Sequence, residues 1–247
     1  MILHEHKCIF IHIPKCAGTS IELALGHLND PEERGAQDHR SIRMIEMPAI
    51  TLGTFSSKEN ILEIARRVRH QYVGKDTNPR NKFTVTKEQY DSYFKFTFIR
   101  NPWSRAFSVY VNVMRDKFHQ KEYGITNQIS LNAFLKLAVG KGFLRPQLYW
   151  MRDFNCCIPF DYIGRFENLA EDFRQICMRL GMAGLALPHE NKGMSQDYRD
   201  YYDGASKDMI LRAYKEEIDR FDYSFEMYVQ HLCLRQTNAV SCSSPMA

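Results

Sequence analysis

Hydrophobic residues recur in three short runs, and each run is followed by a polar turn and then by an amphipathic stretch. The runs are residues 8–13, 94–99 and 160–166. Their nearly unbroken apolarity favours strands that are covered on both faces, as in a parallel sheet. The stretches after the turns have helical spacing, and Ser or Thr is placed to cap the first of them. Three strand-to-helix transitions predict an α/β fold with a central, mainly parallel sheet flanked by helices.

Further helices are predicted between and after these units. Capping-box patterns predict the start of two of them, at Ser56 with Glu59 and at Thr86 with Gln89. Other helical patterns cover residues 131–139, 146–151 and 206–220, and residues 74–82 are expected to form a surface loop. No repeat or linker divides the chain. We therefore expect one domain over residues 1–236 and a disordered tail over 237–247.

The composition is that of an ordinary globular protein. Of the 247 residues, 44% are hydrophobic and 25% are charged, which excludes a disordered, collagen-like or coiled-coil chain. The net charge of +4 is too small for a general binder of nucleic acids or membrane surfaces. It is sufficient for a local basic pocket that holds an anionic ligand.

The compartment is predicted from features that the sequence lacks. No apolar stretch reaches the roughly 18 residues of a membrane span, and the first residues lack the basic-then-apolar order of a signal peptide. We expect a cytoplasmic protein, with a soluble domain trimmed from a membrane-anchored enzyme as the alternative. The seven cysteines lack the spacing of a disulfide scaffold or a zinc site, so most should be buried thiols and no metal site is predicted. The sequence does not indicate an oligomeric state.

The turn after the first run contains the first candidate site. It reads Ile13-Pro14-Lys15-Cys16-Ala17-Gly18-Thr19-Ser20. In a strand-loop-helix frame the backbone N–H groups point at one spot, and the lysine and the hydroxyls add further donors. The nucleoside-triphosphate loop Gly-x4-Gly-Lys-Ser/Thr does not match, because here the lysine precedes the glycine. A phosphate-sized anion site is predicted, and the alternative is a turn that is basic by coincidence.

A second candidate site follows the second run. Arg100 lies where the strand should end, and Ser108 lies two turns into the next helix, whose first turn suits Pro102. This pair could bind another phosphate. The alternative is that Arg100 pairs with a carboxylate while Ser108 packs against a neighbouring helix.

Together, the two segments resemble the carbohydrate sulfotransferases of the sulfotransferase-2 type, which use 3′-phosphoadenosine 5′-phosphosulfate (PAPS). The first segment resembles the 5′-phosphosulfate loop of that family, and the second resembles its 3′-phosphate segment. Residues 162–169 are similar to its third strand and turn, and residues 189–192 with the last helix resemble its C-terminal part. The resemblance covers residues 8–228, without a match for 47–93, and implies a P-loop-like sulfotransferase fold.

The resemblance also implies a role for each motif residue. Lys15 would be catalytic and would neutralise charge on the departing phosphate as the S–O bond breaks. Arg100 and Ser108 would hold the 3′-phosphate, and no metal is required. The residues that bind PAPS, or its product PAP, would be Lys15, Cys16, Ala17, Gly18, Thr19, Ser20, Arg100, Ser108 and Lys192.

An acceptor hydroxyl also needs a general base. His39 is predicted for this role because it resembles a histidine of the family near the same place, and Asp38 or Glu46 could orient it. The alternative is that His39 is an exposed loop residue. Three other histidines are considered. His12 is expected in the core, and His70 and His189 are expected at the surface or in a loop. His189 is the second choice for the base.

Acceptor binding is assigned to Arg40, Arg43 and Gln147. Guanidinium groups suit bidentate contacts with sulfate or carboxylate, and residues 66–69 could extend such a groove or form a solvated helix face. The resemblance places Gln147 on the acceptor side. The aromatic residues beside it could stack on a sugar ring or fill the core.

The sequence therefore predicts a PAPS-dependent enzyme that moves a sulfuryl group to a carbohydrate hydroxyl by in-line displacement. A small alcohol, a lipid or a protein tyrosine is the alternative acceptor. A nucleotide kinase and a catalytically silent nucleotide-binding protein are more remote alternatives, and the residue order of the first loop argues against the kinase.

Overall fold

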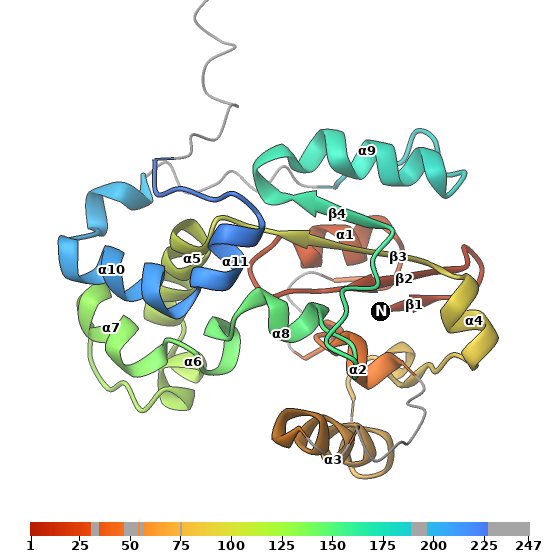
Figure 1. Ribbon diagram of the computed structural model, residues 1–247, viewed down its shortest axis with the longest axis horizontal. Helices are drawn as coiled ribbons and strands as arrows, with labels where there is room; N and C mark the ends of the chain where they lie inside the picture. Colours follow the sequence, from red (N-terminus) through yellow and green to blue (C-terminus); the bar gives the residue numbers. More distant parts are fainter. Residues whose placement is uncertain (31–34, 47–53, 55–56, 75, 189–196, 227–247) are drawn as a thin grey trace, which may run out of the picture.

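Four strands form one mixed sheet in the computed structural model, which describes residues 1–30, 35–46, 54, 57–74, 76–188 and 197–226 (Figure 1). The strand order is β1 (Ile2–Leu3), β2 (Cys8–Ile11), β3 (Phe94–Ile99) and β4 (Tyr162–Arg165). β2, β3 and β4 are parallel, and β1 is antiparallel to β2. The predicted mainly parallel sheet is confirmed. The sequence pattern does not reveal β1, because two residues are too few to show an alternation.

Each parallel strand leads into a helix, as the sequence predicts. β2 leads into α1 (Gly18–Ala24) and β3 leads into α5 (Pro102–Arg115). β4 continues through a 3-10 helix (Phe166–Asn168) into α9 (Leu169–Arg179). Because neighbouring parallel strands end at the same edge of a sheet, the turns after β2 and β3 are neighbours in space.

Capping explains where the helices after β2 and β3 begin. Pro102 is the first residue of α5, and the Asn101 side chain accepts hydrogen bonds from the backbone N–H groups of Trp103 at 3.1 Å and Ser104 at 3.4 Å. The residue before α1 is Ala17, which provides no side-chain cap. The predicted Ser or Thr cap of α1 is therefore wrong, because both hydroxyl residues already lie inside its first turn.

The remaining helices agree largely with the sequence pattern. They are α2 (Ile42–Ile45), α3 (Lys58–Tyr72), α4 (Lys87–Ser92), α6 (Lys117–Glu122), α7 (Leu131–Ala138), α8 (Gln147–Met151), α10 (Gly204–Ala213) and α11 (Lys215–Arg220). The Thr86 capping box of α4 is confirmed. α3 is capped by Ser57, one residue after the predicted Ser56, which lies outside the described residues. The predicted loop 74–82 ends in a 3-10 helix, Pro79–Lys82.

The long helix predicted over residues 206–220 is in fact two helices that meet at Tyr214. The φ of −119° and ψ of 24° at Tyr214 lie outside the helical region. Its side chain is buried, and its hydroxyl donates a hydrogen bond to the backbone oxygen of Leu144 at 2.5 Å. This tertiary contact overrides the helical spacing, which by itself predicts one continuous helix.

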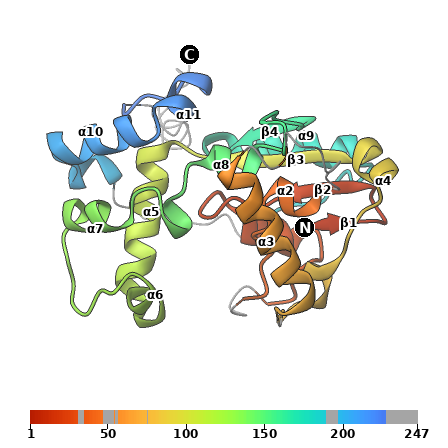
Figure 2. The same ribbon diagram turned by 60° about the horizontal axis from the view of Figure 1, so that its bottom comes forward.

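The molecule has two hydrophobic cores, in groups of elements that lie side by side (Figures 1 and 2). One surrounds the sheet and includes Phe10, Phe96 and Phe98. The other lies among α5, α7, α10 and α11 and includes Phe134 and Ile210. In both views this helical group stands at the carboxyl edge of the sheet, so that α5 joins the sheet to the helical group.

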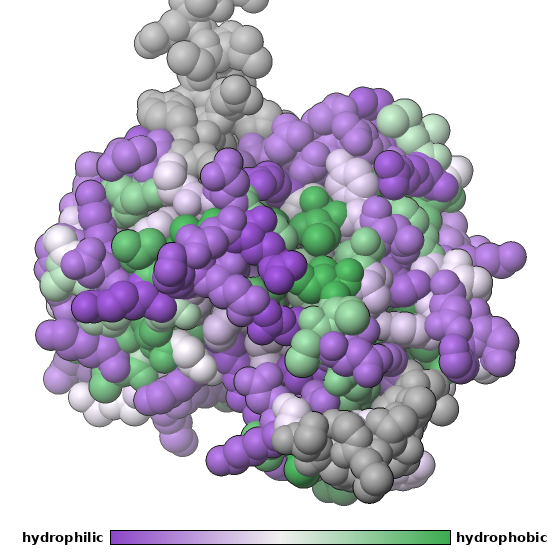
Figure 3. Space-filling model, viewed as in Figure 1, coloured by the Kyte–Doolittle hydropathy of each residue, from purple (hydrophilic) through white to green (hydrophobic). Residues whose placement is uncertain are grey.

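The surface has an ordinary distribution of polar and apolar groups. The face in Figure 3 is mostly hydrophilic around its rim, with hydrophobic residues gathered near its centre. Among the helices of the described ranges, none combines the length and the apolar character needed to cross a membrane. The predicted tail 237–247 lies outside the described residues.

The cysteines follow the prediction in part. Cys8, Cys16 and Cys177 are buried free thiols, as expected. Cys156 and Cys157 are exposed, because they form a turn at the surface in which the Asp153 carboxylate accepts the Cys157 N–H at 2.7 Å.

Candidate functional site

The loop after β2 and the residue after β3 meet at the carboxyl edge of the sheet. Lys15 lies in this loop, and Arg100 follows β3 directly. The Nη1 group of Arg100 donates a hydrogen bond to the backbone oxygen of Lys15 at 3.1 Å. The two predicted anion-binding segments, which are distant in the sequence, are therefore in direct contact.

The backbone of the loop is strained at two residues. Lys15 and Ala17 have φ angles of 67° and 65°, in the left-handed region that costs a residue other than glycine about 1 kcal/mol or more. At Gly18, which follows, an added Cβ would lie 1.9 Å from Cδ2 of the His12 ring. The missing side chain at Gly18 therefore lets α1 begin directly against this ring.

Side chains from outside the loop hold this conformation. The Nε group of Arg105 donates a hydrogen bond to the backbone oxygen of Pro14 at 3.1 Å. The Cys16 thiol donates to Oε1 of Gln147 at 3.5 Å. With the bond from Arg100, three consecutive loop residues are each held by a different side chain, which offsets the cost of the strained backbone.

Lys15 lies in a strongly positive environment. It is partly buried, and within the described part of the chain its Nζ donates one long hydrogen bond, 3.4 Å, to Oδ1 of Asn112 on α5. Burial, with the nearby charges of Arg100 and Arg115, lowers the pKa of Lys15 to about 8. Three cationic groups near one another favour the binding of an anion, which would in turn favour the charged form of Lys15.

Arg100 and Ser108 lie toward the same side of α5. The Nε group of Arg100 donates to Oγ of Ser104 at 3.0 Å, and its guanidinium lies 3.9 Å from the centre of the Phe166 ring. Ser108 is partly buried one turn beyond Ser104, so both serines share a helix face. None of the described residues accepts a hydrogen bond from Nη2 of Arg100.

The other predicted loop residues differ in their access. The Cys16 side chain is 1% exposed and the Ser20 side chain is 4% exposed, whereas Thr19 is partly exposed in the first turn of α1. Lys192, also predicted to bind the donor, lies outside the described residues, as does His189.

His39 is partly buried and not the exposed loop residue of the alternative interpretation. Its Nδ1 lies 3.4 Å from the backbone oxygen of His12, and the two rings are 4.2 Å apart. Burial, reinforced by His12, lowers the pKa of His39 to about 3, so its imidazole is neutral near pH 7. If Nδ1 carries the proton toward the carbonyl, Nε2 keeps the lone pair that a base requires.

The groups expected to orient His39 are engaged elsewhere. Asp38 binds the guanidinium of Arg40, and Glu46 accepts a hydrogen bond from the Phe154 N–H at 3.2 Å. Within the described residues the carbonyl of His12 is the group that orients the ring. The sequence-based choice of Asp38 or Glu46 is therefore corrected.

The two other described histidines that were weighed as the base have structural partners. His12 is 3% exposed, and its Nδ1 lies 3.0 Å from Oε1 of Glu22, which confirms the prediction of a satisfied core histidine. His70 lies at the surface and pairs with Asp76 at 3.3 Å.

The residues assigned to the acceptor lie inside the protein. Arg40 is 5% exposed and paired with Asp38, and Arg43 is 2% exposed and donates to Oδ1 of Asn60 at 3.2 Å. Gln147 has no exposed surface. A sequence shows the charge of an arginine but not its partner, and here the partners turn these side chains inward. This placement argues against an acceptor groove formed by Arg40, Arg43 and Gln147.

Two arginines of α3, Arg66 and Arg67, have partners within the protein, and Arg69 is exposed. Arg66 pairs with Glu63, and Arg67 donates a hydrogen bond to the backbone oxygen of Glu46. This arrangement agrees with the solvated helix face rather than with an extended acceptor groove.

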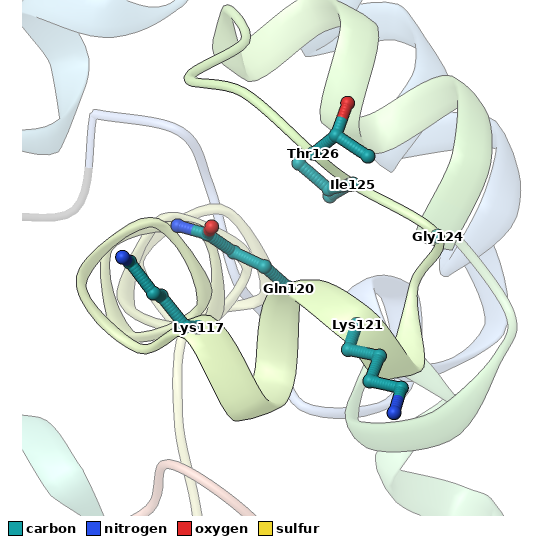
Figure 4. A pocket seen from close by; sticks show the side chains of 6 residues that line it. All are labelled: Lys117, Gln120, Lys121, Gly124, Ile125 and Thr126. Atoms are coloured by element: carbon teal, nitrogen blue, oxygen red, sulfur yellow. The ribbon is translucent and has the colours of Figure 1, made fainter.

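A pocket of about 400 Å³ lies beside α6 and contains none of the predicted site residues (Figure 4). It is lined by Lys117, Gln120, Lys121, Gly124, Ile125 and Thr126. The side chains of Lys117 and Gln120 point to one side of α6, whereas Lys121 points away from them. Because the two ammonium groups do not converge, this pocket lacks the paired charges of an anion site.

Comparison with known proteins gives a consistent result. A family model described as "Sulfotransferase family" matches residues 1–224. Carbohydrate sulfotransferase 14 of Danio rerio is 23% identical over 73% of this chain and 48% of that protein. Carbohydrate sulfotransferase 11 of Mus musculus is 21% identical over 92% of this chain and 67% of that protein. The human carbohydrate sulfotransferase 14 is 27% identical over 71% of this chain and 45% of that protein.

The match covers most of this chain and a part of each relative. The chain spans about half the length of the sulfotransferase 14 proteins. No solved structure matches it significantly.

Proposed function

The chain belongs to the sulfotransferase family, and from this premise we propose that it transfers a sulfuryl group from PAPS to a hydroxyl of a carbohydrate. The contact between Lys15 and Arg100 is the observation that carries the proposal. A donor with a phosphosulfate at one end and a 3′-phosphate at the other requires two neighbouring anion sites. These two cations come from the two segments that would supply them.

The residues present suit such a donor. The loop from Pro14 to Gly18 would surround the 5′-phosphate, with Thr19 as a hydroxyl donor at its end. Arg100 offers Nη2, and Ser108 lies one turn beyond the serine that holds Nε of Arg100. A charged guanidinium N–H donor with a nearby hydroxyl suits a phosphate dianion.

Lys15 would act on the bond that breaks. Its ammonium group would stand where negative charge accumulates on the departing phosphate, and an interaction that strengthens as charge develops lowers the barrier. The low dielectric of its partly buried position increases the effect. The same burial lowers its pKa to about 8, so the group remains mostly protonated at neutral pH.

His39 would take the proton from the acceptor hydroxyl. Its neutral imidazole is oriented through Nδ1 by the His12 carbonyl, which leaves Nε2 for the acceptor. The ring of Phe143 lies 5.6 Å from His39 and is partly exposed, so it offers an apolar surface to a sugar ring. The names of the relatives, both carbohydrate sulfotransferases, favour a carbohydrate over a small alcohol, a lipid or a tyrosine.

Calorimetric titration with adenosine 3′,5′-bisphosphate, beside AMP, ADP and ATP with and without magnesium, tests the donor. We expect binding without added metal that is at least about tenfold tighter for the bisphosphate than for AMP, as one further charged contact would give. Lys15→Ala should reduce sulfate transfer far more than nucleotide binding, and Arg100→Ala should remove the preference for the 3′-phosphate. Tightest binding of ATP with magnesium would contradict the proposal. Transfer of labelled sulfate to glycans, tested beside alcohols and tyrosine peptides, then identifies the acceptor class.

A further inference from the structure

Two buried polar side chains, Gln147 and Glu217, connect the two anion-binding segments inside the protein. Gln147 is the first residue of α8 and has no exposed surface, and Glu217 lies on α11 and is 1% exposed. Neither side chain faces solvent. Any role in the proposed reaction must therefore operate through other residues.

The side-chain amide of Gln147 bonds to both segments. Its Oε1 accepts the Arg100 N–H at 2.8 Å and the Cys16 thiol at 3.5 Å. Its Nε2 donates to the Arg100 backbone oxygen at 2.9 Å. One amide group thus fixes the backbone of Arg100 on both sides and reaches the middle of the loop that follows β2.

Glu217 determines which way this amide points. Its Oε1 accepts a hydrogen bond from Nε2 of Gln147 at 3.2 Å, and its Oε2 accepts the Gln147 backbone N–H at 2.6 Å. A carboxylate only accepts hydrogen bonds, so it requires the NH₂ end of the amide to face it. If the amide were reversed, its oxygen would face the carboxylate and its NH₂ group would face the Arg100 N–H.

Arg105 supplies a compensating positive charge near this pair. It is 1% exposed, and its charge opposes the rise in the pKa of Glu217 that burial causes. Arg105 also holds the backbone oxygen of Pro14, one residue before Lys15. Two buried groups of opposite charge therefore act on the loop: Arg105 binds it directly, and Glu217 acts through Gln147.

We propose that Gln147 and Glu217 are positioning residues that fix the distance between the loop and Arg100, so that one ligand engages both anion sites at once. The inference rests on the proposed donor site. With the spacing fixed before binding, the second phosphate binds without a further ordering cost. If the distance between the loop and Arg100 can vary, each phosphate should still bind, but a ligand with both phosphates should gain less affinity over a ligand with one.

The test compares adenosine 3′,5′-bisphosphate with AMP, in wild type and in Glu217→Gln, by calorimetry at neutral pH. The quantity measured is the affinity ratio of the two nucleotides. In Glu217→Gln the NH₂ of the new amide faces either the side-chain NH₂ or the backbone N–H of Gln147, so one of the two hydrogen bonds that orient Gln147 is lost. We expect the ratio to fall by about tenfold or more while AMP binding changes less than about threefold. An unchanged ratio in a variant that is folded by circular dichroism overturns the inference.

A matched control separates positioning from a general loss of stability. Glu63→Gln also removes a buried carboxylate, one that accepts the Ser41 hydroxyl at 2.6 Å, and it lies on α3, which contributes nothing to the proposed donor site. It should lower the melting temperature without changing the affinity ratio. A loss of the ratio in this variant as well would assign the effect to stability and overturn the inference.

A second variant keeps the test decisive if Glu217→Gln fails to fold. Gln147→Met has a side chain of similar length; it removes the side-chain bonds to Arg100 and Cys16 and leaves the backbone N–H of residue 147 bonded to Glu217. It should lower the affinity ratio by about tenfold or more while AMP binding changes less than about threefold. A folded Gln147→Met protein with an unchanged ratio overturns the inference. If the wild-type protein binds the bisphosphate no more tightly than AMP, the proposed donor site fails together with the inference. If only the variants lose this difference in affinity, the donor site stands.

Discussion

Replacing Gly18 with alanine should damage the candidate site through a single methyl group. The added Cβ would lie 1.9 Å from Cδ2 and 2.1 Å from Nε2 of His12, whereas ordinary contacts begin at 3.4 Å. The ring has little room to retreat, because its Nδ1 is bonded to Glu22 and its other neighbours are the rings of His39 and Phe10. Either the ring or the start of α1 must therefore move by about 1.5 Å.

The size of the effect follows from the cost of overpacking. Forcing an extra methyl group into a packed interior costs about 1–3 kcal/mol. For a chain of this size each kcal/mol lowers the melting temperature by roughly 2–4 °C, so a decrease of about 2–12 °C is expected. Because α1 begins at this contact, the loop before it should shift as well, and AMP binding should weaken by about tenfold.

The assay is thermal unfolding followed by circular dichroism, with AMP titration on the same samples. Gly204→Ala is a matched control, since Gly204 is also the first residue of a helix and an added Cβ there meets nothing within 4 Å. It should melt at or slightly above the wild-type temperature. Adding Gly18→Ala to His12→Ala should cost little, because the ring that clashes is gone. A Gly18→Ala protein that melts and binds like wild type would refute the reasoning.

Three further predictions concern charge and support. Because the pKa of Lys15 is lowered to about 8, kcat/KM for sulfate transfer should decrease as pH rises through about 8, and a pH profile should show this limb move upward in Lys15→Arg. The pKa values of His12 and His39 are lowered to about 3 by burial, below their unfolded values, so the unfolded chain binds more protons and the free energy of unfolding should fall as pH drops from about 6.5 toward 3. Urea titrations at pH 7.5 and 5 check this, and equal stabilities would contradict it. Arg105→Lys leaves buried carbonyls such as that of Pro14 without their donors, so it should destabilise the protein by about 2 kcal/mol and weaken AMP binding, measured by urea denaturation and calorimetry.

Local patterns allow much of the fold to be predicted, because strands and helices of this protein are encoded by short-range periodicity. The three strand-to-helix units, the Pro102 start of α5 and the Thr86 capping box all depend on neighbouring residues. The predictions are wrong where a contact with a distant residue determines the local structure. Tyr214 interrupts a continuous helical pattern because its hydroxyl reaches Leu144, which no local pattern shows.

The candidate site divides in the same way. The loop motif and Arg100 are recognised as segments, and adjacent parallel strands place them together. The inward orientation of Arg40 and Arg43 is not predictable from their charge, because Asp38 and Asn60 become partners only in the folded chain. The orientation of His39 by a backbone carbonyl has no sequence signal at all, since every residue carries such a group.

The support beneath the site is the part that a sequence hides most completely. The bonds from Arg105 to Pro14, from Cys16 to Gln147 and from Gln147 to Glu217 join residues 91, 131 and 70 positions apart. None of these pairs repeats with a period or belongs to a motif that binds a ligand. Yet they hold two non-glycine residues in left-handed backbone conformations and fix the position of Arg100. A change at such a residue should therefore alter nucleotide binding although the residue never touches the nucleotide, and the affinity ratio between one and two phosphates distinguishes this effect from a general loss of stability.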